Sequence, residues 1–338
     1  MLLFSSMKKG LIASVLLLVS VCGTAGFFFY QFLITPGPPL KHPVIVFVHK
    51  GMTLPVIAQR LVTAGMIAHA RLFAWWARLT GADRQIKSGE YLFKTSLSPL
   101  ALLRILMNGE SLRHTVTITE GMTFRQVVAS LATQGLGAEE NFLCLDSDPG
   151  FLAAWGLPPQ GMEGYLYPDT YRFSWLTSPA EVLGQMIKRF YTVLNSAMYR
   201  QAAALDLSMH QVITLASIVE KETGTPAERP LVAAVFYNRL RKGMPLQSDP
   251  TVIYDIDHFD GNLTRQHLLT PTPYNTYLFR GLPPGPIASP GLESIFAALH
   301  PAERDYLYFV AKGDGTHVFS SDLNTHNRAV QRFQRGHS

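Results

Sequence analysis

The feature that most constrains this chain is a run of 24 residues without a charged side chain, Leu11 to Ile34. About 20 apolar residues suffice to cross a bilayer as a helix, whereas the apolar core of a signal peptide is shorter. Lys8 and Lys9 precede the run, and the aromatic cluster 27–30 lies near its end, where an interfacial belt is expected. The run therefore predicts one transmembrane helix over residues 11–34. Residues 1–10 would then be cytoplasmic and the rest of the chain would lie outside the cytoplasm.

Other interpretations of this N-terminus are weaker. A cleaved signal peptide would require an Ala-x-Ala site, and none precedes Pro36. A lipoprotein site at Cys22 is disfavoured because Val21 stands where a small residue is expected. Met7 is an alternative start, because residues 1–6 add nothing that a membrane anchor needs.

Composition limits the remaining possibilities. The chain has 338 residues, of which 47% are hydrophobic, so it has room for two or three domains with a sizeable core. The net charge is only +5 and the charges are dispersed, which argues against a nucleic-acid tract and suits an acidic polymer or a membrane surface. The two cysteines are far apart and the histidines are scattered, so the sequence predicts no disulfide framework, no metal and no cofactor.

A proline-rich linker over residues 35–43 separates the apolar run from a predicted domain over residues 44–112. The domain reads as a strand–helix–helix–strand module: strand 44–48, helices 54–64 and 69–80, strand 89–93. Trp75 and Trp76 resemble a sugar platform, but their helical spacing with neighbouring leucines predicts that at least one of them is core.

This module recurs further along the chain. The pattern Val46-x-Val48-x-x-Gly-Met-Thr-Leu54 is repeated by Val116-x-Ile118-x-x-Gly-Met-Thr-Phe124, at an offset of 70 residues. The pattern Tyr91-x-Phe93, with Ser98-Pro99 after it, is repeated at an offset of 80 residues. The sequence therefore predicts a duplicated module with an insertion inside the second copy, and an α+β fold overall. In each copy, Ser-Pro is expected to begin a helix.

The segment Gln211–Thr223 is predicted to be a buried helix, because it is almost entirely apolar until its end and Ser208 and Gln211 have capping-box spacing. Glu220 continues one apolar stripe of this helix, and burial there would favour the protonated form that a general acid needs. Glu222 is a rival, because its own face is equally apolar and periodicity cannot separate the two. The ordinary alternative is a glutamate that is solvated or paired with a nearby cation, for which Lys221, Arg229 and Arg239 are candidates.

Several polar and aromatic stretches surround this helix. Residues 163–171 combine two carboxyl groups with tyrosines and predict either a sugar-binding stretch or a strand edge with core tyrosines. Residues 228–241 are expected to form a helix, and residues 281–291 a rigid loop rich in proline and glycine. A hairpin is predicted from strands 306–310 and 317–319, followed by a terminal helix over 322–333.

Taken together, these motifs resemble the endolytic murein transglycosylases of the YceG-like (MltG) family over essentially the whole chain. The resemblance is carried, in order, by Ala216-Ser-Ile-Val-Glu220-Lys-Glu-Thr223, Leu246-Gln-Ser-Asp-Pro-Thr-Val-Ile-Tyr254, Pro273-Tyr-Asn-Thr-Tyr277, Gly281-Leu-Pro-Pro-Gly285, Pro290-Gly291 and Tyr306-Leu-Tyr-Phe-Val310. It implies an inner-membrane helix, a LysM-like module over residues 44–112, and a catalytic domain over residues 113–338 in the periplasm.

The resemblance also implies the chemistry. Such an enzyme cleaves the β-1,4 bond between N-acetylmuramic acid and N-acetylglucosamine, and the C6 hydroxyl of the muramyl sugar closes a 1,6-anhydro ring. The resemblance assigns the general acid, then base, to Glu220. Residues that would bind the substrate are Glu163, Ser217, Gln247, Ser248, Asp249, Tyr254, Asn275 and Tyr277. Peptidoglycan strands and penicillin-binding proteins are the partners that it implies.

Two other functions remain open at this point. One is a membrane-anchored scaffold that binds peptidoglycan through its LysM-like module and has no catalytic activity. The other is a hydrolytic muramidase, in which water attacks instead of the muramyl hydroxyl. Such an enzyme would need a second carboxyl group, with Glu163 or Asp249 as the first candidates.

Overall fold

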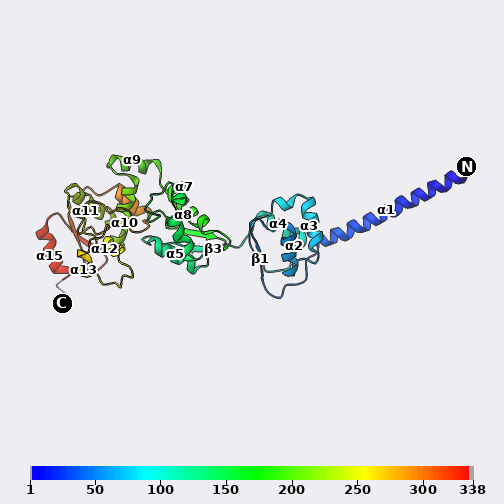
Figure 1. Ribbon diagram of the computed structural model, residues 1–338, viewed down its shortest axis with the longest axis horizontal. Helices are drawn as coiled ribbons and strands as arrows, with labels where there is room; N and C mark the ends of the chain where they lie inside the picture. The colour runs from blue at the N-terminus through cyan, green and yellow to red at the C-terminus, as the bar shows by residue number, and fades with distance from the viewer. Residues whose placement is uncertain (1, 335–338) are drawn as a thin grey trace. The chain divides into compact units, whose positions relative to one another are not determined.

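The computed structural model describes residues 2–334, which divide into two compact units. The N-terminal unit comprises the chain up to residue 114 together with residues 174–176. The C-terminal unit comprises residues 115–173 and the chain from residue 177 onward. Each unit has its own hydrophobic core, and the two units are described separately (Figure 1).

In chain order, the elements of the N-terminal unit are α1 (Leu2–Ile34), β1 (Val44–Val48), α2 (Leu54–Thr63), α3 (Ala70–Leu79), the short 3-10 helix η1 (Ala82–Arg84), β2 (Gly89–Phe93) and α4 (Pro99–Asn108). Strand β1 pairs antiparallel with β2, so that Val44 lies opposite Phe93 and Val48 opposite Gly89. Helices α2, α3 and α4 bury their apolar sides in the same core as this two-stranded sheet. Trp76 is buried at 8% exposure and Trp75 is 56% exposed, which confirms that one of the two tryptophans is core.

Helix α1 contains one segment, Ser14–Ile34, that is long and apolar enough to cross a membrane. Most of its described side chains are exposed, as a lipid-facing helix requires. Its last turns behave differently, because Phe29, Phe32 and Leu33 pack against the core of the N-terminal unit. The helix is therefore attached to the module that follows it by side-chain packing as well as by the linker.

The C-terminal unit begins with β3 and continues with helices and two further strand pairings. Its elements are β3 (His114–Thr117), α5 (Phe124–Thr133), α6 (Glu139–Asp146), α7 (Pro149–Ala154), β4 (Thr170–Phe173), α8 (Pro179–Val193), α9 (Ser196–Ala204), α10 (Met209–Glu222), η2 (Pro226–Glu228), α11 (Arg229–Arg241), α12 (Asp249–Tyr254), α13 (Arg265–Leu269), α14 (Leu292–Leu299), β5 (Tyr308–Ala311), β6 (His317–Ser320) and α15 (Leu323–Phe333). Strand β3 pairs with β4, and β5 pairs antiparallel with β6.

The order of elements in the N-terminal unit recurs at the start of the C-terminal unit. Helix α5 lies 70 residues after α2 at both of its ends, and α8 begins 80 residues after α4. Ser98 and Ser178 cap α4 and α8 through their side chains, as the Ser-Pro pairs predict. The additional residues of the second copy form α7 and an irregular segment that leads into β4. The stretch from Glu163 is therefore a strand only from Thr170, and its tyrosines are core residues.

Helix α10 lies at the centre of the C-terminal unit. The Ser208–Gln211 capping box that the sequence predicts is present at its start. All eight residues from Val212 to Val219 are buried, since α10 contacts α9, α11, α12 and α14 (Figure 1). The segment after Ser248 forms the short helix α12, which contacts α10. Helix α10 thus has no free face until its last turn, where the two glutamates lie.

Candidate active site

Glu220 and Glu222 both lie in the last turn of α10. Residues two positions apart in an α-helix are separated by about 200° around its axis. The side chains of Glu220 and Glu222 therefore leave α10 on opposite sides. The structure places them in two different surroundings, one with an arginine cluster and one with a cavity. The chemistry that each can perform follows from those surroundings.

The carboxylate of Glu222 faces the start of α12. Its Oε1 atom accepts a hydrogen bond of 2.5 Å from the Oγ atom of Ser248. Burial and, to a lesser extent, the nearby charge of Asp249 raise the pKa of Glu222, while the Ser248 hydrogen bond and Arg239 lower it, and the resulting pKa is about 7. A carboxyl group with this pKa can both donate and accept a proton near neutral pH.

Glu222 lines a cavity of about 430 Å³. One side of the cavity is formed by residues of the predicted site, namely Glu222, Gln247, Asp249 and Tyr277, together with Arg239. The other side is formed by β5, β6 and α15. Most of the lining surface that the cavity exposes is polar, which suits a carbohydrate better than an apolar ligand.

Asp249 and Tyr277 form a pair at this cavity. The Tyr277 hydroxyl donates a hydrogen bond of 2.5 Å to Oδ1 of Asp249. Burial, followed by this contact with Asp249, raises the pKa of the Tyr277 hydroxyl, so it stays a donor at neutral pH. Asp249 and Gln247 are exposed at the cavity and can reach a ligand.

Arg239 builds the wall of the cavity. Its Nε atom donates to the carbonyl of Leu307 at 2.7 Å, and its Nη1 atom donates to Leu246 O at 2.9 Å and to Gln247 Oε1 at 3.0 Å. Gln247 has a positive φ of 53°, a left-handed conformation that costs energy in a residue other than glycine. The Arg239 guanidinium therefore holds a strained turn beside Glu222.

Glu220 lies in a charged cluster on the other side of α10. Its Oε1 atom is 3.2 Å from Nη2 of Arg229, and its Oε2 atom accepts a hydrogen bond of 2.9 Å from the backbone N–H of Gly291. Glu120 and Glu293 approach the same guanidinium. Only 7% of the Glu220 side chain is exposed. These contacts join the end of α10 to the starts of α11 and α14.

Glu163 lies at the N-terminus of α5 and does not line the cavity beside Glu222. Both of its carboxylate oxygens accept from the backbone N–H of Phe124 at 3.0 Å, which places a negative charge where the helix dipole favours one. Burial raises the pKa of Glu163, and hydrogen bonds from Phe124 and Tyr254 offset only part of that rise, so the resulting pKa is about 7. Tyr254 packs against Tyr274, with ring centroids 4.7 Å apart.

Ser217 and Asn275, the other two predicted site residues, are fully buried and their polar atoms bind the protein itself. The Ser217 hydroxyl donates to Thr214 O and accepts from the N–H of Ile287. The Asn275 amide donates to Thr270 O at 2.7 Å and accepts from the N–H of Tyr277 at 3.0 Å. These contacts shape the loops of the site and leave little for a sugar.

The structure thus brings Glu222, Gln247, Asp249 and Tyr277 together at one cavity, with Ser248 bonded to Glu222. Glu220, Glu163 and Tyr254 do not line that cavity. Sequence reasoning missed the roles of Arg239 and of the β5–β6 hairpin at the cavity. From the sequence, Arg239 is only a candidate ion partner for a glutamate at the end of α10. No local pattern predicts that its guanidinium binds the turn formed by residues 245–247. Among residues 2–334, no group of three or more metal-ligating side chains lies together.

Comparisons with known proteins agree with this arrangement of elements. The sequence pattern of the YceG-like family matches residues 46–332. A Bacillus subtilis protein named endolytic murein transglycosylase is 32% identical over 311 residues, which cover 87% of this chain and 85% of that protein. A Streptococcus pneumoniae protein of the same name is 29% identical, and the match covers 95% of this chain but 65% of that longer protein. A crystal structure of a yceG-like protein from Listeria monocytogenes aligns with 86% of this chain and 99% of its own, with a TM-score of 0.59 and 30% identity.

Proposed function

This chain belongs to the YceG-like family, and on that basis we propose that it is a membrane-anchored lytic transglycosylase that cleaves peptidoglycan within its glycan strands. The bond cleaved would be the β-1,4 bond between N-acetylmuramic acid and N-acetylglucosamine, with 1,6-anhydro-muramyl ends as products. The observation that carries the proposal is a carboxyl group with a pKa of about 7, Glu222, at a polar cavity.

The geometry favours Glu222 over Glu220 as the general acid and base. Glu222 opens into the cavity beside Gln247 and Asp249. The Glu220 carboxylate already has two partners within the protein, the guanidinium of Arg229 and the backbone N–H of Gly291. We therefore propose Glu222 for proton transfer, and we keep Glu220, which the family resemblance favours, as the alternative that mutation must exclude.

The reaction needs only one such group. Protonated Glu222 donates its proton to the glycosidic oxygen as the bond from that oxygen to C1 of the muramyl sugar breaks. The C6 hydroxyl of the same sugar then forms a bond to C1 and gives its proton to the Glu222 carboxylate. The catalytic group returns to its starting state and no water is consumed. The pKa of Glu222 must lie near the working pH, because the same atoms release and recover a proton.

Other residues of the cavity support this step. Ser248 fixes the Glu222 carboxyl group through its hydroxyl. The Asp249 carboxylate can stabilise the positive charge that develops on the sugar ring, and Tyr277 holds Asp249 in place. Gln247 offers an amide to a sugar hydroxyl from the edge of the cavity.

The proposed anchor is α1. Its apolar segment Ser14–Ile34 has the length of a bilayer span, and Lys8 and Lys9 before it favour a cytoplasmic N-terminus. Both units would then lie on the outer side of the inner membrane, where peptidoglycan is found.

The test is digestion of purified peptidoglycan by the full chain in detergent, with the products identified by mass. We expect muropeptides that end in 1,6-anhydro-muramic acid, with long fragments appearing early if cleavage is within strands. Reducing muramic acid ends would instead indicate a hydrolytic muramidase. An absence of products, with the chain still sedimenting with peptidoglycan, would indicate a non-catalytic scaffold.

A further inference from the structure

We propose that the N-terminal unit binds the outer surface of the bilayer through the exposed side of α3, which we call the α3 face. The α3 face consists of Arg71, Trp75, Arg78 and Leu79, and the partner is a bilayer containing anionic phospholipid. The proposal rests on the membrane anchor proposed above for α1. It adds that the module after the anchor is itself held at the membrane.

The length of α1 fixes the level at which this contact occurs. A hydrocarbon core of about 30 Å is crossed by about 20 helical residues. Counted from Lys9, the last charged residue before the apolar run, 20 residues end at Phe29, and the apolar segment itself ends at Ile34, so the outer edge of that core lies between these two residues. The ring of Phe29 contacts Trp75 of α3 edge to face, with centroids 5.8 Å apart. Trp75 therefore lies at the level where a membrane interface is expected.

The side chains of the α3 face suit that level. Trp75 is 56% exposed and Leu79 is 69% exposed, so two large apolar side chains lie together on the free side of α3. Arg71 and Arg78 are also exposed and occupy the same side of the helix, since residues spaced by three, four, seven or eight positions share a face. Tryptophan favours the membrane interface, and arginine pairs with phosphate while its stem lies along apolar surface.

The charge of the module points to an anionic partner. Residues 41–113 contain ten Lys or Arg and three Asp or Glu, a net charge of +7. Residues 114–338 contain 17 Lys or Arg and 21 Asp or Glu, a net charge of −4. The mild overall charge of the chain therefore conceals a strongly basic module next to the anchor. Clusters of basic residues beside a transmembrane helix are attracted to anionic lipid head groups.

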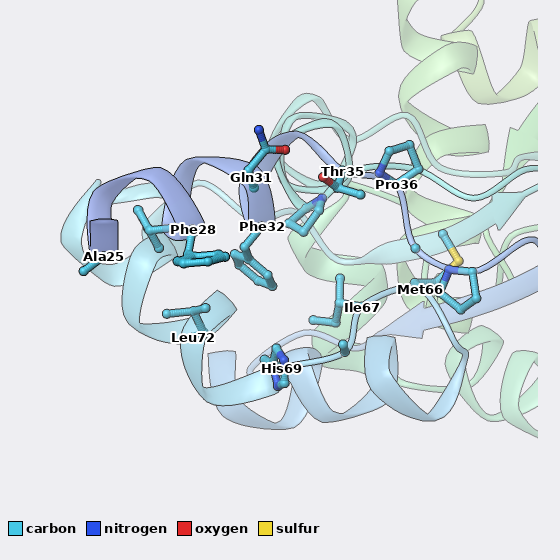
Figure 2. Close-up of a pocket in the computed structure, with 15 residues that line it drawn as sticks. Ala25, Phe28, Gln31, Phe32, Thr35, Pro36, Met66, Ile67, His69 and Leu72 are labelled. Carbon is cyan, nitrogen blue, oxygen red and sulfur yellow. The ribbon is translucent and has the colours of Figure 1, made fainter. Parts of the chain in front are cut away.

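An apolar cavity continues from the end of α1. It has a volume of about 640 Å³ and lies between the last turns of α1 and residues 66–72. Figure 2 shows Phe28 and Phe32 pointing from α1 toward Ile67 and Leu72 across this space. Because most of the exposed lining is apolar, the cavity can admit the acyl chain of a lipid from the same leaflet.

The experiment places a nitroxide label on the full chain in nanodiscs that contain anionic lipid. Both native cysteines are first replaced, by Cys22→Ala and Cys144→Ser. The label is attached at Leu79→Cys on the α3 face, or at Glu110→Cys as the control. Glu110 is exposed just after α4. It lies near the Val48–Gly89 end of the β1–β2 sheet, whereas the linker joins the sheet at Val44. The accessibility of each label to oxygen and to a water-soluble nickel complex is then measured.

We expect the label at position 79 to collide mainly with oxygen and the label at position 110 mainly with nickel. Arg71→Glu with Arg78→Glu should move label 79 toward water, because each arginine near an anionic surface changes binding by about fivefold. Lys50→Glu, in the exposed turn after β1, is the matched charge control and should leave label 79 unchanged.

The result that overturns the proposal is a label at 79 as accessible to nickel as the label at 110. If the paired Arg→Glu variant then loses binding to peptidoglycan, the α3 face is a glycan site instead. Failure of the anchor itself is distinguishable, because the chain would then not stay with the nanodiscs at all. Failure of the proposed enzyme activity is separate too, because the labelled variants can be assayed for peptidoglycan cleavage.

Discussion

The Oγ atom of Ser248 lies 2.5 Å from Oε1 of Glu222 and donates a hydrogen bond to it, which joins the end of α10 to the start of α12. This contact stabilises the charged form of a carboxyl group that burial otherwise keeps protonated. It therefore sets both the position of the proposed proton donor and the pH range in which the donor works.

Replacement of Ser248 by alanine tests this relationship. Loss of the hydroxyl should raise the pKa of Glu222, so the decline of kcat/KM on the alkaline side should move up by about half a pH unit to one unit. The value of kcat/KM at its optimum should fall about tenfold, because the carboxyl group loses its orientation. The measurement is the pH profile of cleavage of purified glycan strands.

Ser217→Ala provides the control for that variant. Ser217 is equally buried and also joins α10 to a loop, but it does not touch Glu222. It should lower stability by a similar amount and leave the pH profile in place. The same shift in both variants would show that the effect is a general consequence of loosening α10.

Glu220 and Glu293 bind the same guanidinium, that of Arg229, but differ in burial. The Glu220 side chain is 7% exposed and that of Glu293 is 64% exposed. Removing a charge that is partly buried and hydrogen-bonded costs about 1–3 kcal/mol, whereas an exposed pair contributes less than about 1 kcal/mol. Glu220→Gln should therefore lower the melting temperature by several degrees, and Glu293→Gln should hardly change it. Equal effects of the two substitutions would argue against a structural role for Glu220.

Asn275 is expected to act through stability. Its amide donates to the carbonyls of Leu268 and Thr270 and accepts from the N–H of Tyr277. Asn275→Ala should destabilise the unit by about 1–3 kcal/mol, because buried backbone groups lose their partners. Asn262→Ala, at an exposed position in the same region, is the control and should be neutral. A variant with wild-type melting temperature and reduced turnover would instead support direct contact with substrate.

Glu163 makes stability depend on pH. Its pKa is about 7 in the folded chain, above the value of 4.5 for an unperturbed glutamate. Because the folded state binds this proton more tightly than the unfolded state, the free energy of unfolding is highest below pH 4.5. It falls as the pH rises from 4.5 toward 7. Thermal melts of wild type should show this decline, which amounts to at most about 3 kcal/mol. Glu222 has a similarly raised pKa, so Glu163→Gln should reduce the decline by about half, and an unchanged slope would contradict the burial of Glu163.

The sequence predicts much of this fold because its local signals are strong. The Ser208–Gln211 capping box, the Ser-Pro helix starts and the β5–β6 hairpin all appear as expected. Such features depend on residues within a few positions of one another, so they can be recognised in one sequence. The internal repeat also predicts the order of elements over a longer stretch of the chain, because the same order occurs twice.

Periodicity alone could not distinguish Glu220 from Glu222, although the family resemblance assigns the role to Glu220, and the reason is physical. Both follow eight consecutive buried residues, so α10 has apolar neighbours on every side and no hydrophobic period to orient it. What distinguishes them is tertiary contact, with Arg229 on one side and Ser248 on the other. Those partners lie 9 and 26 residues away in the chain, and no local pattern predicts which glutamate each one meets.

The measurement that tests the central claim most directly is peptidoglycan cleavage by Glu222→Gln and Glu220→Gln at matched folded concentration. The account predicts that Glu222→Gln forms no anhydro-muramyl products while its fold and substrate binding persist. Glu220→Gln should keep measurable activity once its lower stability is allowed for. The opposite result, with activity retained by Glu222→Gln and abolished in folded Glu220→Gln, would contradict this account and make Glu220 the proton donor.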